Sequence, residues 1–122
     1  MRVIVVETQK EPVVQDIDTG LASMQKIVGG SIEAIYPFDE PVALICNEEG
    51  KLLNLPLNRA LRDENGAVYD IISGTFFLCA APPDSDRFKG LDDQQVKTYM
   101  EYFATPEMIL NVGGDLFVLP YL

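Results

Sequence analysis

The side chains best suited to binding a ligand gather in one segment, residues 47–61, whose sequence is NEEGKLLNLPLNRAL. Asn47 and Asn58 carry amides that both donate and accept hydrogen bonds. Arg59 carries a guanidinium whose planar fork suits a carboxylate or a phosphate. A plain turn needs none of the three. We therefore expect Asn47, Asn58 and Arg59 to form an edge that binds a ligand or a partner.

Two further residues belong to this candidate site, and all five also have a structural interpretation. Lys51 would add a second cation, and Tyr36 on the preceding strand would add an aromatic wall. Alternatively, Asn47 would hydrogen-bond the backbone of its turn, and Asn58 would cap a short helix that begins near Arg59. Lys51 would then lay its aliphatic stem on apolar surface, and Tyr36 would pack in the core. The sequence leaves both interpretations open.

Several catalytic chemistries are disfavoured by the residue types present. The chain has no histidine, which removes the commonest general base near neutral pH. The adjacent acids at 48–49, 63–64 and 92–93 fall where turns or a helix start are expected, whereas hydrolysis by two carboxylates needs them across a cleft. Neither a phosphate-binding loop nor a dinucleotide-binding glycine pattern occurs. We expect no catalytic residue, no metal and no cofactor; a carboxylate- and metal-dependent enzyme is the alternative.

The two cysteines, Cys46 and Cys79, both lie inside apolar runs, VALIC and TFFLCAA. Their spacing does not match a zinc site, and the start of the chain lacks the features of a signal peptide. Cytoplasmic proteins keep their thiols reduced. We therefore expect a cytoplasmic protein with two buried free thiols rather than a disulfide.

Length and charge limit the domain count and the partners. At 122 residues, 48% of them hydrophobic, the chain is expected to form one globular domain over 1–122. No apolar run approaches the ~20 residues that cross a bilayer. The net charge of −10 disfavours direct nucleic-acid binding and anionic membranes, and it favours a partner with a basic face.

The elements that must position the candidate residues follow from hydrophobic periodicity and turn residues. We expect two main helices, one capped by Asp18 or Thr19 and ended by Gly29, and one capped by Asp92. A short helix is expected near residues 57–62. Strands are expected at 2–7, 13–17, 31–38, 42–46, 51–55, 68–80, 108–112 and 116–119. This order predicts an α+β fold, a mostly antiparallel mixed sheet with both main helices on one face.

Two long stretches carry a resemblance to a known family. They are LASMQKIVGGSIEAIYP at 21–37 and VALICNEEGKLLNLPLNRALRDENGAVYDIISGTFFLC at 42–79. This pattern resembles a family numbered 3846 among the domains of unknown function, which occurs in Gram-positive bacteria, their phages and their conjugative elements. The resemblance implies an accessory role on a mobile element, with counter-defence as one version. It brings no catalytic residue.

Together these observations predict a small non-catalytic binding protein. Its expected partner is a host protein or a small anionic ligand, and a purely structural interaction module is the alternative. The chain ends in the apolar sequence LFVLPYL at 116–122. This segment would either pack at a homodimer interface or dock back on the core of its own chain.

Overall fold

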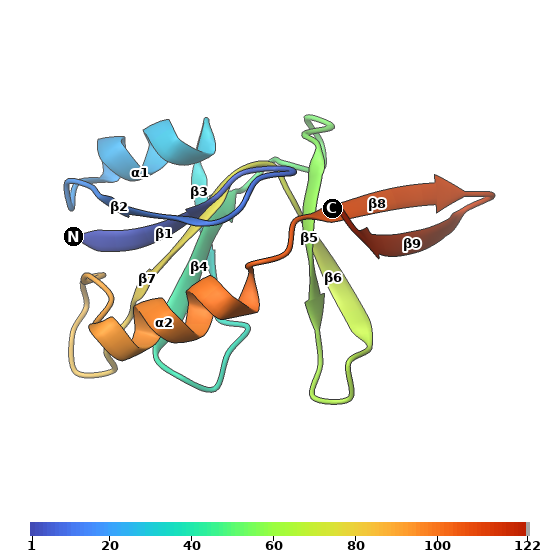
Figure 1. Ribbon diagram of the computed structural model, residues 1–122. Coiled ribbons are helices and arrows are strands. Elements are labelled where there is room, and N and C mark those ends of the chain that lie inside the picture. The colour runs from blue at the N-terminus through green and yellow to red at the C-terminus, as the bar shows by residue number, and fades with distance from the viewer. Residues whose placement is uncertain (122) are drawn as a thin grey trace.

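The computed structural model describes residues 1–121 and places them in nine strands and two helices (Figure 1). In chain order these are β1 Arg2–Val6, β2 Val13–Asp16, α1 Leu21–Val28, β3 Ile32–Ile35, β4 Val42–Asn47, β5 Leu57–Arg62, β6 Val68–Ser73, β7 Phe76–Ala80, α2 Asp93–Tyr102, β8 Glu107–Val112 and β9 Asp115–Pro120. The α+β class is as the sequence predicts.

The main layer is a five-stranded sheet in the order β2-β1-β7-β4-β3. Every neighbouring pair in it is antiparallel, so the described sheet is not mixed. The central strands β1, β7 and β4 are continuous apolar runs, and they are buried on both faces. Such runs are typical of strands that are covered on two sides.

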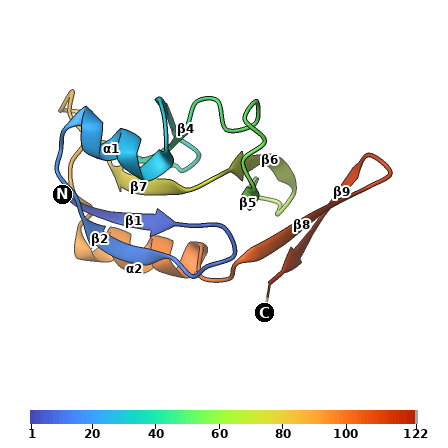
Figure 2. The same ribbon diagram turned by 90° about the horizontal axis from the view of Figure 1, so that it is seen from above.

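The two helices cover opposite faces of this sheet, which corrects the expectation that they share one face (Figure 2). Because successive side chains of a strand point to opposite faces, Phe76 and Phe77 on β7 enter different cores. Phe76 packs with Phe103, the residue that follows α2, and Phe77 packs in the core that α1 closes with Met24. Periodicity identified the apolar stripes of the helices, but it carried no information about which face each would cover.

The ends of the helices agree only partly with the sequence. α2 has the predicted capping box, in which Asp92 accepts from the Gln95 backbone and Gln95 accepts from the Asp92 backbone. α1 follows Gly20, and no side chain caps it, so the predicted cap at Asp18 or Thr19 is wrong. Gly29 ends α1 with a φ of +79°, as a left-handed C-terminal glycine does.

The segment expected to hold a short helix is a strand instead. Residues 57–62 form β5, which pairs with β6 in a separate two-stranded sheet. The turn between them contains Asn65 and Gly66, and Gly66 has a φ of +82°. That strong hairpin turn draws the preceding residues into a strand, which overrides their weak helix propensity. Residues 51–54, expected to begin a strand, form turns before β5.

Gly74 divides the long apolar stretch between residues 68 and 80 into two strands of different sheets. Its φ is +81°, and a Cβ placed on it would lie 2.8 Å from Leu55 Cδ1. Only glycine accepts both constraints without strain. The chain can therefore leave the β5–β6 hairpin at this point and enter the centre of the main sheet.

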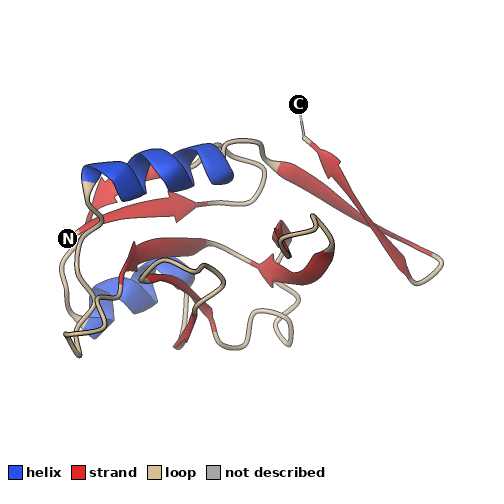
Figure 3. Ribbon diagram, turned by 90° about the horizontal axis from the view of Figure 1, so that it is seen from below, coloured by secondary structure: helices blue, strands red, loops and turns tan. Residues whose placement is uncertain are grey.

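The last two strands, β8 and β9, form a third sheet that projects from the body (Figure 1). Beyond its base beside β5, the hairpin extends away from the main sheet (Figure 3). Of the two alternatives for this apolar segment, docking back on the core is therefore wrong, and packing at a homodimer interface stays a prediction. Within residues 1–121, no helix has both the length and the apolar character needed to cross a membrane.

Candidate functional site

Asn58 is fully buried and connects three parts of the chain. Its Nδ2 donates to the carbonyl oxygen of Val6 at 2.9 Å and to that of Gly74 at 2.9 Å, and its Oδ1 accepts from Arg59 Nη1 at 2.9 Å. These bonds join β5 to the end of β1 and to Gly74, in the short connection between β6 and β7. Asn58 sits within a strand and caps no helix, so the predicted capping role is wrong.

Arg59 is 2% exposed, which is unusual for a charged side chain. Its Nη2 donates to the carbonyl oxygens of Lys10 at 2.7 Å and Phe103 at 3.2 Å. Its Nε has no hydrogen-bond partner among the described residues. Among the same residues, no carboxylate forms an ion pair with the Arg59 guanidinium. Burial lowers the pKa of the guanidinium, while the charge of Glu107 acts in the opposite direction.

Asn47 lies at the end of β4 and serves a different junction. Its Nδ2 donates to the Val28 carbonyl oxygen at 3.2 Å, and its Oδ1 accepts from the Glu49 backbone at 2.8 Å. A Cβ on Gly30 would lie 2.9 Å from that Nδ2. Asn47 therefore ties the end of α1 to the turn after β4, and it shares no hydrogen bond with Asn58 or Arg59.

The other two predicted residues lie outside this buried cluster. Lys51 pairs with Asp70 of β6 at 2.8 Å, and both groups are partly exposed. An exposed pair of this kind contributes little to stability. Tyr36 is 62% exposed, whereas its neighbour Phe38 packs on the ring of Tyr99. The structure thus brings Asn58 and Arg59 together and leaves Asn47, Lys51 and Tyr36 apart from them.

A cavity of about 250 Å³ adjoins Arg59, between β5, the end of α2 and the β8–β9 hairpin. It is lined by Arg59, Ala60, Arg62, Tyr102, Phe103, Thr105, Glu107, Val118 and Pro120. Glu107 closes one side, where its carboxylate accepts from the Ala60 backbone at 3.0 Å and from Arg62 Nη2 at 2.6 Å. Sequence reasoning missed Arg62 and Glu107 because no local pattern brings β5 beside β8.

The projecting β8–β9 hairpin carries more exposed large apolar side chains than the other described strands do. Cross-strand partners lie on the same face, so the pairs Met108–Leu119, Leu110–Phe117 and Val112–Asp115 define one face. The opposite face carries Glu107, whose carboxylate accepts from the Ala60 backbone of β5, and Val118; both residues line the cavity. We call the first the outward face; on it Leu110, Val112, Phe117 and Leu119 are 39 to 60% exposed.

The family model described as "Domain of unknown function (DUF3846)" matches residues 1–104. The chain belongs to this family. The matched residues of the DUF3846 domain run from β1 to the end of α2, and they include the buried pair Asn58 and Arg59. The β8–β9 hairpin follows the matched residues. No curated protein and no solved structure matches the chain.

The charged side chains of the DUF3846 domain form no cluster of the kind that binds a metal ion. Among residues 1–121, no three side chains of the aspartate, glutamate, cysteine and histidine types come close enough to hold one ion. Arg59 and Arg62 line the cavity, and the outward face presents exposed apolar side chains.

The two thiols of the DUF3846 domain are buried and free, as the sequence predicts. Burial raises the pKa of Cys46 to about 11 and that of Cys79 to about 12. Because the thiolate is the reactive form, neither residue should react with an aromatic disulfide reagent in the native protein at pH 8. Both should react once denaturant is added. Rapid release of two equivalents of chromophore from the native protein would contradict this expectation.

Proposed function

We propose that the protein is a non-catalytic binding protein that holds a different protein against the outward face of its β8–β9 hairpin. The observation that carries this proposal is the exposure of Leu110, Val112, Phe117 and Leu119 on one face. Exposed apolar side chains that gather on one face of a protein mark interaction sites. A two-stranded hairpin is also marginal by itself, so a partner that covers it would stabilise it.

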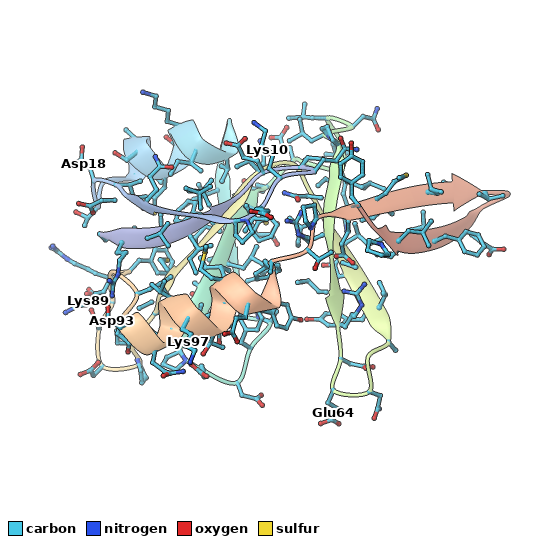
Figure 4. The ribbon with its side chains drawn as sticks, viewed as in Figure 1. Lys10, Asp18, Glu64, Lys89, Asp93 and Lys97 are labelled. Carbon is cyan, nitrogen blue, oxygen red and sulfur yellow. The ribbon has the colours of Figure 1, made fainter. Side chains whose placement is uncertain are left out.

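The charge of the chain argues for the chemistry of this partner. The chain carries a net charge of −10, and the exposed Asp115 lies on the outward face itself, after the β8–β9 turn. Asp63 and Glu64 lie at the tip of the separate β5–β6 hairpin. Figure 4 shows Glu64 at the tip of β5–β6, pointing into solvent. A partner with an apolar patch bordered by basic residues would complement both features. A second copy of this acidic chain would meet repulsion between the two bodies.

The biological setting is part of the same proposal. We place the protein in the cytoplasm, as an accessory protein of a phage or another mobile element, where its partner is a host protein. Interference with a host defence is one outcome that such binding would produce. The membership of the chain in the DUF3846 family is consistent with this setting, because the family resemblance described above implies it.

A capture experiment with paired variants tests the proposal. Leu110→Ser combined with Phe117→Ser makes the outward face polar, and both side chains are already exposed, so the main core is unchanged. Because the two residues are cross-strand partners, backbone amide shifts of the variant establish first that the hairpin remains paired. The matched control is Val13→Ser with Val14→Ser, an equally exposed apolar pair on the edge strand β2. We expect wild type and control to capture the same basic protein from a host lysate, and the hairpin variant to lose it.

Two outcomes would contradict this account. If the hairpin variant captures the same proteins as wild type, the outward face is not the binding surface. If sedimentation shows that purified wild type is a dimer and that the hairpin variant is a monomer, a second copy occupies the face instead. Capture should also weaken as salt is raised, because salt screens the attraction between acidic and basic surfaces.

A further inference from the structure

The cavity beside Arg59 contains more positive than negative charge, in contrast to the acidic chain around it. Its charged lining residues are Arg59, Arg62 and Glu107, so two guanidinium groups face one carboxylate. The lining therefore has one excess positive charge. Glu107 is engaged by Arg62 at 2.6 Å and by the Ala60 backbone at 3.0 Å, and it forms no hydrogen bond with Arg59.

Arg59 itself supplies the second observation. It is almost completely buried, four neighbouring oxygen atoms accept from its two Nη groups, and its Nε–H donor has no partner among the described residues. A buried charge without a contacting counter-charge and a buried donor without an acceptor both cost free energy. A negatively charged ligand in the cavity would supply the missing counter-charge.

We propose that this cavity binds a small organic monocarboxylate. A single negative charge matches the single excess positive charge of the lining. A carboxylate suits the planar donors of Arg62, and Arg59 and Thr105 belong to the same lining.

The rest of the lining favours an organic acid over inorganic phosphate. Phe103, Val118 and Pro120 present apolar surface, and the ring of Tyr102 adds to it. An inorganic dianion would bring excess charge into a small space that also contains Glu107. The volume of about 250 Å³ is close to the lower end of ligand pockets, which suits an acid the size of butyrate or benzoate.

This site is separate from the surface proposed for a protein partner. Val118 pairs with Ile109 and lies on the opposite face of the hairpin from Phe117. The cavity proposal rests on the charge of its lining, and either proposal can fail without the other.

Nuclear magnetic resonance titration of the labelled full chain tests the proposal. Benzoate, butyrate, inorganic phosphate and chloride are added separately at constant ionic strength and pH. We expect saturable shifts with benzoate and butyrate at the amides of Ala60, Phe103 and Thr105, and weaker or no shifts with phosphate and chloride. No saturable shift at high millimolar carboxylate would overturn the proposal, and tighter binding of phosphate would overturn the assignment to carboxylates.

Three variants make the test specific to the cavity. Arg62→Gln, at a partly exposed position, removes the excess charge and should weaken benzoate binding by roughly tenfold, the loss of about one charge-assisted hydrogen bond. Glu107→Gln should tighten it, because repulsion is removed while the amide oxygen still accepts from Ala60. Lys97→Gln is the control, since it changes the net charge as Arg62→Gln does on the exposed side of α2 (Figure 4). Equal loss in Arg62→Gln and Lys97→Gln would overturn the cavity site.

Discussion

Replacing Arg59 with methionine should lower the free energy of unfolding by about 3 kcal/mol, because buried acceptors lose their donors. The carbonyl oxygens of Lys10 and Phe103 and the Oδ1 of Asn58 all receive hydrogen bonds from this guanidinium. Methionine fills much of the same volume, so the loss reports the hydrogen bonds more than the packing. Removing the buried charge offsets part of the cost, and it does so without supplying any new donor.

Urea denaturation followed by circular dichroism measures this loss. Lysine at position 59 should also destabilise, because a point-like ammonium cannot reach acceptors on three segments as the guanidinium fork does. Lys97→Met on the exposed side of α2 is the control, and it should change stability by less than about 0.5 kcal/mol. If Arg59→Met is as stable as wild type, Arg59 does not join β5 to the rest of the fold.

Replacing Asn58 with leucine should cost a similar amount, about 3 kcal/mol, although leucine has nearly the same shape. The substitution leaves the carbonyl oxygens of Val6 and Gly74 without this donor, and Arg59 Nη1 loses its short acceptor. Both carbonyl groups lie where β5 meets the main sheet. The same urea measurement applies, with Gln94→Leu on the exposed side of α2 as the control.

The double variant Asn58→Leu/Arg59→Met tests whether the two residues act as one hydrogen-bonded unit. Residues within one hydrogen-bond network couple by about 0.5 to 3 kcal/mol in double-mutant cycles. The two losses should therefore sum to more than the loss in the double variant, because each single change already removes the bond between them at 2.9 Å. Strict additivity would show that the two residues act independently.

Local patterns in the sequence were enough to predict most of the elements. The apolar runs at β4 and β7, the Asp92 capping box and the Gly113–Gly114 turn each depend on neighbours a few residues away. Such signals hold when a segment is surrounded by strong turn residues. The prediction failed at β5, because its conformation is set by pairing with β6 across a turn rather than by its own residues.

The candidate site was only partly predictable, for a related physical reason. Asn58 and Arg59 were singled out as polar residues in an apolar segment, and they are buried together. Their partners Val6, Lys10 and Phe103 are 44 to 52 residues away in sequence. The sequence therefore indicates that Asn58 and Arg59 are unusual. Which carbonyl groups accept their hydrogen bonds is decided by how separate elements pack together, and local sequence does not show this.

Hydrogen exchange on the complex with a captured basic partner tests most directly whether the outward face of the β8–β9 hairpin binds a protein. Exchange is compared between the free protein and the complex, amide by amide. Binding at this face should slow exchange in residues 107–120, where an isolated hairpin opens readily, and leave β2 and α1 unchanged. Unchanged exchange in the hairpin, with slowing elsewhere, would contradict the claim.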